Sequence, residues 1–374
     1  MKIAFIFGTR PEAIKLAPVI QYFQKDNSLN IDICITGQHK EMLKQVMDMF
    51  NLTPTTDLSL MQPNQTLASF TARAVDKLDV YFEESKPEAI FVQGDTSTVL
   101  AASLSAFYHK IKIFHIEAGL RTFDKYSPFP EEMNRKLTSV LADYHFSPTQ
   151  ISRQNLLKES VADDRIIVTG NTAIDALINI SSRLETDKAL KTLIDNSIPD
   201  IIKESNRIIL VTGHRRENFG KGFEEICDAI KNLAQEFYDY LFVYPVHLNP
   251  NVQKFVLSNL SGIKNVQLLP PQNYVSFIYL MKKAYLILTD SGGIQEEAPS
   301  LQKPILVMRD TTERPEGIAA GCAKLVGPSK NHIVKAVQEI LLNKNLYNNM
   351  IGIPNPYGDG NASAIIYNYF KDVM

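Results

Sequence analysis

Short β-rich runs alternate with helical patterns along the chain, and this alternation restricts the fold more than any other feature. In the first half, the runs lie near 2–7, 31–36, 89–93, 111–116, 143–146 and 166–169. Helical patterns lie at 11–24, 40–50, 66–84, 97–108, 131–141 and 149–158. A strand, a helix and a further strand in this order form a right-handed βαβ unit with parallel strands. The pattern predicts a doubly wound α/β domain.

The alternation restarts with the run RIILVTGH at 207–214. Further β-rich runs lie near 241–246, 265–269, 285–289, 304–308 and 323–326. Residues 185–205 contain charges and a proline but no β-rich run, so this segment is a candidate linker with helical character. The C-terminal segment NASAIIYNYFKDVM predicts a docked helix, because one helical stripe carries Ile365, Ile366, Tyr369 and Phe370.

Length and composition favour a soluble protein of two domains. The 374 residues are 45% hydrophobic, which is enough for two cores of about 150–200 residues each. The net charge is −2 and no run of Lys or Arg is present, so we expect no nucleic-acid or membrane partner. The run at 2–8 is too short for a secretion signal, and no run is long enough to span a bilayer. We therefore expect a cytoplasmic location.

The three cysteines are isolated in the sequence. Their odd number and wide spacing suggest neither a disulfide framework nor a thiolate zinc site. We expect buried apolar thiols in a reducing compartment at Cys34, Cys227 and Cys322.

Three carboxylates follow apolar runs in the first half of the chain. Asp95 and Glu117 come just after two of the runs, and Glu131 follows a proline-rich turn. An open parallel sheet places its chemistry at the carboxyl ends of its strands. Burial and neighbouring like charges spread the pKa values of acids, which prepares them for proton transfer. This arrangement predicts an enzyme.

The first β-rich run leads directly into Gly8-Thr9-Arg10-Pro11-Glu12, and Lys15 lies one helical turn beyond Pro11. A helix N-terminus with an Arg and a Lys nearby suits a phosphate, although a solvated helix start is the plainer alternative. Neither GxGxxG nor GxxxxGK[ST] occurs in the chain, which argues against a nicotinamide cofactor and against P-loop hydrolysis.

The second half contains a matching set of groups for an anion. After Asp290, the residues Ser291-Gly292-Gly293 open a helix, and backbone N–H groups at glycines can approach a phosphate closely. Glu296 and Glu297 follow in the first turns, and either one can favour the helix dipole or accept from ribose hydroxyls. His214, Arg215 and Arg216 follow another run, and Arg309, Glu313 and Arg314 lie in a loop after a third. A diphosphate or a set of carboxylates would satisfy these cations.

The remaining histidines do not form a metal site. His115 and His145 lie within apolar runs and are more typical of satisfied core residues, whereas His39 and His247 follow runs. No set of His, Asp and Glu has the spacing of metal ligands, so we expect no metal.

Taken together, several motifs resemble the non-hydrolysing UDP-N-acetylglucosamine 2-epimerases over nearly the whole chain. They are GTRPEAIKLAPVI (8–20), TGQH (36–39), QGDTSTVLAA (93–102), HIEAGLRTFD (115–124), PFPEEMNR (128–135), TGHRREN (212–218), TDSGGIQEEAPSL (289–301) and RDTTERPE (309–316). The resemblance implies two Rossmann-like domains facing a cleft, as in the glycosyltransferase-B fold, with the last helix packed on the first domain. We expect domains at 1–172 with 361–374, and at 173–360.

The resemblance implies interconversion of UDP-N-acetylglucosamine and UDP-N-acetylmannosamine without a cofactor, supplying units for surface polysaccharides. UDP leaves to give 2-acetamidoglucal, then returns while a proton reaches the other face of C2. Matching the family's motifs, the catalytic positions are Asp95, Glu117, Glu131, Arg135 and His214. Besides Asp95, Glu117 and His214, the matching substrate contacts are Arg10, Lys15, Gln272, Phe277, Ser291, Gly292, Gly293, Glu297 and Arg314. A homodimer is also implied.

Three other functions remain open at this point. A hydrolysing 2-epimerase would release free N-acetylmannosamine, but Pro11-Glu12 resembles the non-hydrolysing branch. A glycosyltransferase would use one dominant base where this chain has three acids, and a silent nucleotide-sugar sensor would not need all three. Because acids lie mainly in the first half and phosphate-binding groups mainly in the second, we also expect the domains to close on UDP.

Some members of the family bind UDP-N-acetylglucosamine at an allosteric site, and Gln38 and His39 match its positions. Glu41 and Asn64 stand where the regulated members have a glutamine and an arginine. Because the loss of a cation beside a diphosphate removes a strong contact, we predict weak or absent activation by substrate. Initial rates against substrate concentration should be hyperbolic. A sigmoidal curve that His39→Ala abolishes would contradict this prediction.

Overall fold

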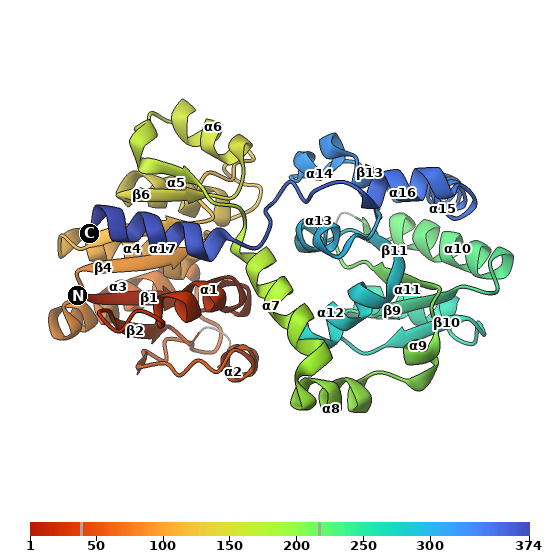
Figure 1. The fold of residues 1–374 in the computed structure, drawn as a ribbon, viewed down its shortest axis with the longest axis horizontal. Helices are drawn as coiled ribbons and strands as arrows, with labels where there is room; N and C mark the ends of the chain where they lie inside the picture. The colour runs from red at the N-terminus through yellow and green to blue at the C-terminus, as the bar shows by residue number, and fades with distance from the viewer. Residues whose placement is uncertain (38–39, 216–217) are drawn as a thin grey trace. The chain divides into compact units, whose positions relative to one another are not determined.

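The computed structural model describes residues 1–37, 40–215 and 218–374. The chain divides into two compact units, which we call unit 1 (Met1–Ala176 and Gly358–Met374) and unit 2 (Leu177–Tyr357). Each unit contains one parallel sheet covered by helices (Figure 1). The domain bounds expected from the sequence remain a proposal about which segments fold independently.

Unit 1 contains a seven-stranded sheet in the order β3-β2-β1-β4-β5-β6-β7. Its strands are β1 (Lys2–Phe7), β2 (Asn30–Ile35), β3 (Thr56–Asp57), β4 (Ala89–Gln93), β5 (Lys112–Ile116), β6 (Tyr144–Ser147) and β7 (Ile166–Val168), all paired in parallel. The order reverses between β1 and β4, which is where doubly wound sheets bind ligands. The six strands expected from the sequence are confirmed. The two-residue strand β3 is too short to produce a pattern.

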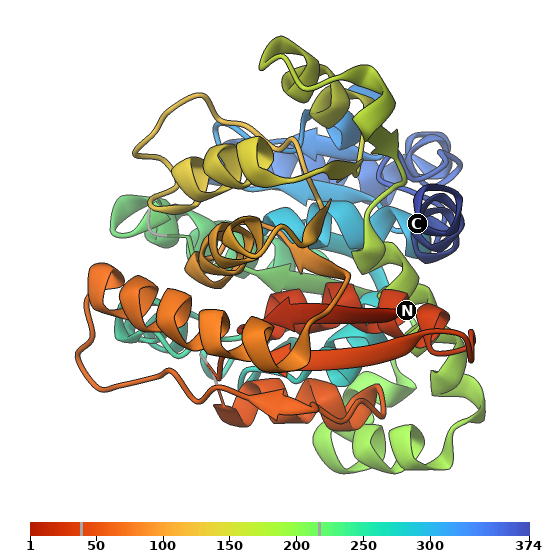
Figure 2. The same cartoon turned by 90° about the vertical axis from the view of Figure 1, so that its left-hand side faces the viewer.

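Helices cover both faces of this sheet. They are α1 (Arg10–Phe23), α2 (Lys40–Met49), α3 (Leu67–Ser85), α4 (Ser97–Tyr108), α5 (Glu131–Leu141), α6 (Gln150–Lys158), the start of α7 (Thr172–Thr186) and α17 (Ala362–Val373), with the short 3-10 helix η1 (Asp163–Arg165). In Figure 2, α3, α4 and α5 form a row on one side of the sheet, and α17 lies on the other side next to α1. The C-terminal helix therefore belongs to unit 1, as expected.

An aromatic row crosses four strands on the face that α17 covers. Phe5, Phe91, Phe114 and Tyr144 are register partners on β1, β4, β5 and β6. Their rings stack in turn with centroid distances of 4.8, 4.9 and 4.9 Å. These rings stack because in-register parallel pairing places side chains that point to the same face next to each other on neighbouring strands.

The C-terminal helix packs on this aromatic row through Phe370. Its ring centroid lies 5.3 Å from that of Phe114 and 5.5 Å from that of Phe91, and the side chain is fully buried. Asp175 of α7 accepts a hydrogen bond from the backbone N–H of Ser363 at 2.8 Å and so caps the start of α17. Within the expected apolar stripe, Ile366 is buried, but Ile365 is 38% exposed and lies outside it.

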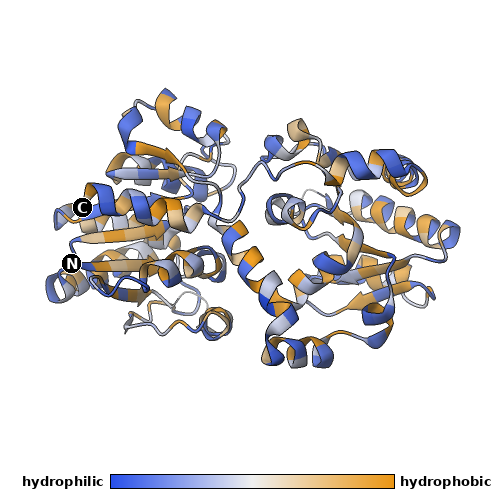
Figure 3. Ribbon diagram, in the orientation of Figure 1, coloured by the Kyte–Doolittle hydropathy of each residue, from blue (hydrophilic) through white to orange (hydrophobic). Residues whose placement is uncertain are grey.

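Unit 2 contains a six-stranded parallel sheet in the order β10-β9-β8-β11-β12-β13. Its strands are β8 (Ile208–Thr212), β9 (Leu241–Pro245), β10 (Val266–Leu269), β11 (Ala284–Thr289), β12 (Ile305–Val307) and β13 (Ala323–Leu325). The helices around it, after the end of α7, are α8 (Lys188–Ser197), α9 (Asp200–Glu204), α10 (Lys221–Glu236), α11 (Pro250–Leu260), α12 (Tyr274–Lys283), α13 (Gly292–Glu297), η3 (Ala298–Leu301), α14 (Pro315–Ala320), α15 (Lys330–Leu342) and α16 (Lys344–Ile351). The strands are mainly apolar, as Figure 3 shows, because helices cover both faces.

The segment 185–205 is helical, but it is not a linker. Leu190 and Ile194 of α8, Ile198, and Ile202 of α9 are each at most 7% exposed. Ser197 Oγ lies 2.9 Å from Ser276 Oγ of α12. The linker prediction was wrong because the charges of this segment lie on the outer face of helices whose apolar face is packed into unit 2.

Among the described residues, no helix is both long enough and apolar enough to cross a membrane.

Replacing Phe370 by alanine should loosen the sheet of unit 1. Truncating a fully buried Phe costs about 3–5 kcal/mol, through lost contacts and the cavity left behind. Because the two units need not unfold together, the measurement is amide hydrogen exchange by mass spectrometry on peptides from β4 and β5. Ile365→Ala, on the exposed side of the same helix, is the matched control. Equal acceleration of exchange in both variants would contradict the packing role of Phe370.

Candidate active site

The carboxyl ends of β4 and β5 bring Asp95 and Glu117 to the same edge of the sheet. Gln93, the last residue of β4, is the register partner of Ile116, the last residue of β5. The N–H of Gly94 donates to the carbonyl of Ile116 at 3.0 Å, which ties the turn after β4 to the end of β5. Glu117 follows β5 directly and Asp95 follows β4 after Gly94, so both lie just past strand ends, as the sequence predicted.

Glu117 lies in a polar nest that is largely closed to solvent, with its side chain 8% exposed. Lys15 Nζ of α1 and Gln93 Nε2 contact its two carboxylate oxygens, and Asn171 Nδ2 lies 3.5 Å from Oε1. Its backbone has φ +65°, a left-handed conformation that is uncommon for a non-glycine residue. Strain of this kind persists only when surrounding contacts hold it, and it is frequent at functional sites.

Asp95 is paired with Arg135 of α5. Arg135 Nε and Nη2 donate to Asp95 Oδ2 at 3.1 and 2.6 Å. Asn134 Nδ2 donates to the backbone carbonyl of Asp95 at 2.9 Å. Burial raises the pKa of Asp95, and the nearby charge of Glu117 adds to this, while Arg135 and Lys15 oppose it. Asp95 is therefore more easily protonated than an ordinary aspartate.

The acid that contacts Arg135 from its own helix is Glu132, which the sequence did not single out. Glu132 Oε2 accepts from Arg135 Nη1 at 3.3 Å, and the Glu132 side chain has no exposure to solvent. Glu131, the predicted acid, is half-buried and begins α5. It lies four residues before Arg135 and so on the same helical face. Within the described residues, its side chain makes no hydrogen bond or ion pair.

The start of α1 is held by a capping box. Thr9 is the N-cap, and Glu12 Oε2 accepts from the N–H groups of Gly8 and Thr9 at 3.0 and 2.7 Å. Thr96 Oγ1 donates to Glu12 Oε1 at 2.7 Å, so this acid also ties α1 to the turn after β4. Arg10 begins the helix and is half-buried. Lys15 is paired with Glu117. The alternative that this helix start is simply solvated is therefore wrong for Lys15.

In unit 2, Asp290 organises the loop that follows β8. Its Oδ2 accepts from the N–H groups of His214 and Arg215, both at 2.8 Å, and its side chain is fully buried. His214 Nδ1 lies 3.4 Å from Asp290 Oδ1, and the ring of His247 stacks on that of His214 at 5.4 Å. Burial lowers the pKa of His214, although Asp290 opposes the shift. Tyr244 OH donates to the carbonyl of Gly213, where an added Cβ would come within 2.9 Å of that hydroxyl.

Carboxylates pair the arginines near this loop. Arg309 Nη1 donates to Glu313 Oε2 at 2.6 Å, Arg215 Nη2 lies 3.6 Å from Glu313 Oε1, and Arg314 contacts Glu296. The sequence left a diphosphate or carboxylates as the alternatives for these cations. Within the described residues, Glu313 and Glu296 contact three of these cations, and these contacts do not decide between the two alternatives. Arg215 Nε, however, is a buried donor with no partner in the described chain, which leaves a position for an anion.

The remaining predicted residues lie just before or within α12 and α13 of unit 2. Ser291 is the N-cap of α13, and a Cβ added at Gly292 would lie 3.2 Å from Glu313 and 3.8 Å from Arg215, whereas Gly293 has open space around it. Gln272 precedes α12 and donates to the carbonyl of Pro270 at 2.7 Å. Glu297 Oε1 accepts from Tyr274 OH at 3.1 Å, and Phe277 of α12 is half-buried.

The structure adds residues that the sequence analysis missed. Gln93, Asn171 and Glu132 contact predicted residues, and Asp290 holds the backbone of two of them. Gln93 and Asp290 were detectable in principle, because each lies at the end of a β-rich run. The sequence could not single out Glu132, because the adjacent Glu131 has the same side chain. The two residues differ only in the direction in which each points from the helix.

Both apolar-strand histidines are buried in the core. His115 Nε2 contacts the carbonyl of Gly94 at 2.8 Å. Burial lowers the pKa of His115 to about 4 and the pKa of His145 to about 3. The sequence suggested buried histidines with all their hydrogen bonds made. Both are buried, but the Nδ1 atom of each has no hydrogen-bond partner within the described chain. The cysteines are free and buried, and no group of three His, Cys, Asp or Glu could hold a metal in the described residues.

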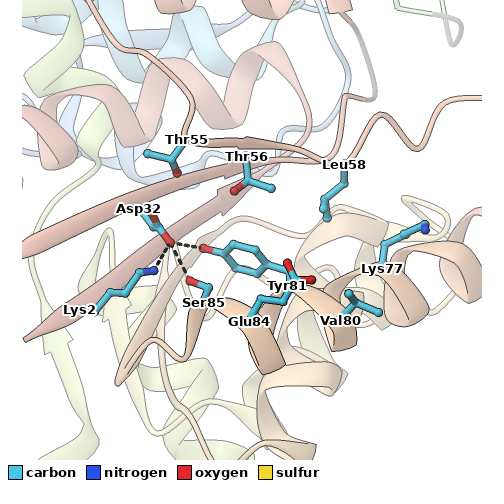
Figure 4. Close-up of a pocket in the computed structure, with 10 residues that line it drawn as sticks. All are labelled: Lys2, Asp32, Thr55, Thr56, Leu58, Lys77, Val80, Tyr81, Glu84 and Ser85. Carbon is cyan, nitrogen blue, oxygen red and sulfur yellow. Dashed lines mark hydrogen bonds and ion pairs between the residues drawn. The ribbon is translucent and has the colours of Figure 1, made fainter.

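A pocket of about 340 Å³ in unit 1 contains none of the predicted residues. Figure 4 shows Asp32 within it, where Lys2, Tyr81 and Ser85 contact its Oδ2 at 3.0, 3.0 and 2.7 Å. This carboxylate is therefore satisfied by its own chain. Gln38, His39 and Arg216 lie outside the described residues.

Comparisons with known proteins agree with this geometry. The family profile described as UDP-N-acetylglucosamine 2-epimerase matches residues 21–371. A UDP-N-acetylglucosamine 2-epimerase from Escherichia coli K12 is 52% identical over 372 residues, which cover 100% of this chain and 99% of that protein. The crystal structure of a UDP-GlcNAc 2-epimerase from Neisseria meningitidis bound to UDP-GlcNAc is 50% identical, with a TM-score of 0.91 and coverage of 100% of both chains.

More distant structures show the same fold. A UDP-GlcNAc 2-epimerase from Methanocaldococcus jannaschii is 34% identical with a TM-score of 0.86 and full coverage of both chains. MurG from Acinetobacter baumannii, at 12% identity and a TM-score of 0.62, resembles this chain in fold alone. The glycosyltransferase-B class with two Rossmann-like domains, expected from the sequence, is confirmed. The chain belongs to the UDP-N-acetylglucosamine 2-epimerase family of isomerases.

Proposed function

We propose that this chain interconverts UDP-N-acetylglucosamine and UDP-N-acetylmannosamine without hydrolysing them. The observation that carries the proposal is the cluster of paired acids and cations at the ends of β4 and β5, in a chain about half identical to named epimerases over its full length. The family motifs in the sequence include the acids and cations of this cluster.

The proposed reaction is an elimination followed by an addition. A carboxylate removes the proton from C2 while the C1–O bond breaks, so that UDP leaves and 2-acetamidoglucal forms. UDP then returns to C1, and an acid delivers a proton to the opposite face of C2. The C2 proton has no adjacent carbonyl to acidify it, so its loss must accompany the departure of the diphosphate. No electrons are exchanged with a cofactor.

We assign the proton transfers to Asp95, Glu117 and Glu131 of unit 1. The raised pKa of Asp95 makes its protonated form more accessible than in an ordinary aspartate, which suits a group that takes and returns a proton. Lys15 contacts Glu117 and holds that carboxylate in place. Arg135 fixes the orientation of Asp95 by donating twice to one oxygen.

We assign the UDP group to unit 2. The unpartnered Nε of Arg215 and the open space at Gly293 support a diphosphate near the start of α13. His214 and Arg314 are assigned to the phosphates. The predicted contacts for uracil and ribose are Phe277 and Glu297, and the other predicted nucleotide-sugar contacts of unit 2 are Gln272, Ser291 and Gly292. Arg10 of unit 1 is a further predicted contact.

We also propose a homodimer and a role in supplying N-acetylmannosamine units for surface polysaccharides, both from the family resemblance. An apolar stripe on α5 supports a second copy as partner, since Met133, Leu137 and Val140 recur at helical spacing and are 38%, 45% and 84% exposed. Light scattering of the purified protein tests the dimer.

Incubation with UDP-N-acetylglucosamine in heavy water, without added cofactor, should yield UDP-N-acetylmannosamine carrying deuterium at C2. Proton exchange with solvent is expected, because the proton leaves on a carboxylate. Proton and phosphorus NMR follow the time course. Free N-acetylmannosamine with UDP would indicate the hydrolysing branch, and an unchanged spectrum would favour a transferase or a sensor.

Asp95→Asn should reduce turnover by at least about 1,000-fold, because an amide cannot exchange the proton that the reaction requires. UDP binding, measured by calorimetry, should change less than about threefold, since Asp95 is assigned to the sugar. The control is Asp79→Asn, which removes an exposed carboxylate paired with His109. Unchanged turnover in Asp95→Asn would exclude the assigned role.

A further inference from the structure

Glu132 is the most completely buried carboxylate near the proposed proton-transfer residues, and no role has yet been assigned to it. Its side chain is fully closed to solvent. The carboxylate accepts three hydrogen bonds, from Thr122 N at 3.1 Å, Phe123 N at 3.0 Å and Arg135 Nη1 at 3.3 Å. A carboxylate buried to this degree requires hydrogen-bond partners, because burying an unpaired polar group costs free energy. Here the partners come from two different parts of unit 1.

The first part is the loop 120–130, between β5 and α5. Thr122 Oγ1 contacts the carbonyl of Ser127, and the N–H of Tyr126 donates to Asp124 Oδ1 at 3.0 Å, so the loop holds its own shape. Three aromatic side chains are exposed on it, with Phe123, Tyr126 and Phe129 between 61% and 68% exposed. Glu132 holds the base of this loop through two backbone N–H groups.

The second part is the ion pair of Arg135 with Asp95. The guanidinium uses Nε and Nη2 for Asp95 and Nη1 for Glu132, so two carboxylates fix the plane of one rigid group. A guanidinium fixed at both ends cannot rotate away from Asp95. One buried acid therefore connects the loop backbone, the arginine and the proposed proton-transfer group.

We propose that Glu132 is a positioning residue for the epimerisation, acting through Arg135 on Asp95 and anchoring the loop 120–130 in the same arrangement. The inference rests on the proposed function for its effect on turnover. Its effect on the loop is independent of that function.

The first test is Glu132→Gln, which keeps the shape of the side chain but removes its charge. Glutamine offers one acceptor oxygen. Either the Phe123 N–H loses its acceptor, or the Thr122 N–H and Arg135 Nη1, which share Oε2, both lose theirs. Turnover should fall about 10- to 100-fold, while KM changes less than about threefold, because misplacing a supporting group affects the reacting geometry more than substrate binding. The control is Asp79→Asn, which removes a carboxylate of unit 1 that pairs with His109 and not with Arg135 or the loop 120–130. Turnover equal to wild type in Glu132→Gln would overturn the proposal.

A double-mutant cycle with Arg135→Lys tests whether the effect passes through Arg135. The residual rate of each variant is measured by deuterium incorporation at C2 over long incubation. If Glu132 acts through Arg135, adding Glu132→Gln to Arg135→Lys should lower the rate less than about threefold. Multiplicative losses would overturn a role through Arg135.

Limited trypsin digestion of the same variants tests the loop without any turnover. Cleavage after Lys125 should be at least about tenfold faster in Glu132→Gln than in wild type, and unchanged in Asp79→Asn. Equal cleavage rates would overturn the anchoring role. A wild-type protein that fails to epimerise, combined with faster cleavage of the variant, would contradict the proposed function and leave the anchoring established.

Discussion

In-register parallel pairing of β4 with β5 is the constraint on which the rest of unit 1 depends. Gln93 and Ile116 end their strands as register partners, so the residues that follow, Asp95 and Glu117, arrive at the same edge. The same register aligns Phe91 with Phe114, which builds the aromatic row that holds the C-terminal helix. One pairing pattern thus sets both the chemistry at one edge and the core between the sheet and α17.

Buried and partly buried charged side chains in both units form small groups in which each charge contacts an opposite charge. In unit 1, Lys15 faces Glu117, while Arg135 lies between Asp95 and Glu132. Leaving one partner of such a set unpaired costs several kcal/mol, which is why each charge fixes the position of the next. Side chains held in this way cannot move easily to relieve strain. The left-handed backbone conformation of Glu117 is consistent with such a rigid site. A preorganised set of this kind suits proton transfer at a carbon that is not acidic by itself.

Much of the fold could be predicted from the chain, because strand pattern and helix pattern are local properties. Strands longer than three residues were all anticipated, whereas β3 was missed because two residues carry no pattern. The segment 185–205 was misjudged as a linker, since its packing against unit 2 depends on partners far away in sequence. The exposure of Ile365 was missed for a similar reason, because the helical stripe is wider than the surface that covers it.

The amino-acid sequence alone was enough to predict the α/β class, the restart at residue 207, the family motifs and the strand ends where Asp95 and Glu117 lie. These features follow from local periodicity and from residue types at fixed positions along the chain. The folded structure was needed to show that Glu132 contacts Arg135, that Glu12 caps α1 and that carboxylates pair with Arg309 and Arg314. The physical reason is that a charged side chain has many possible partners in sequence, and burial with hydrogen-bond geometry selects among them only once the backbone is folded.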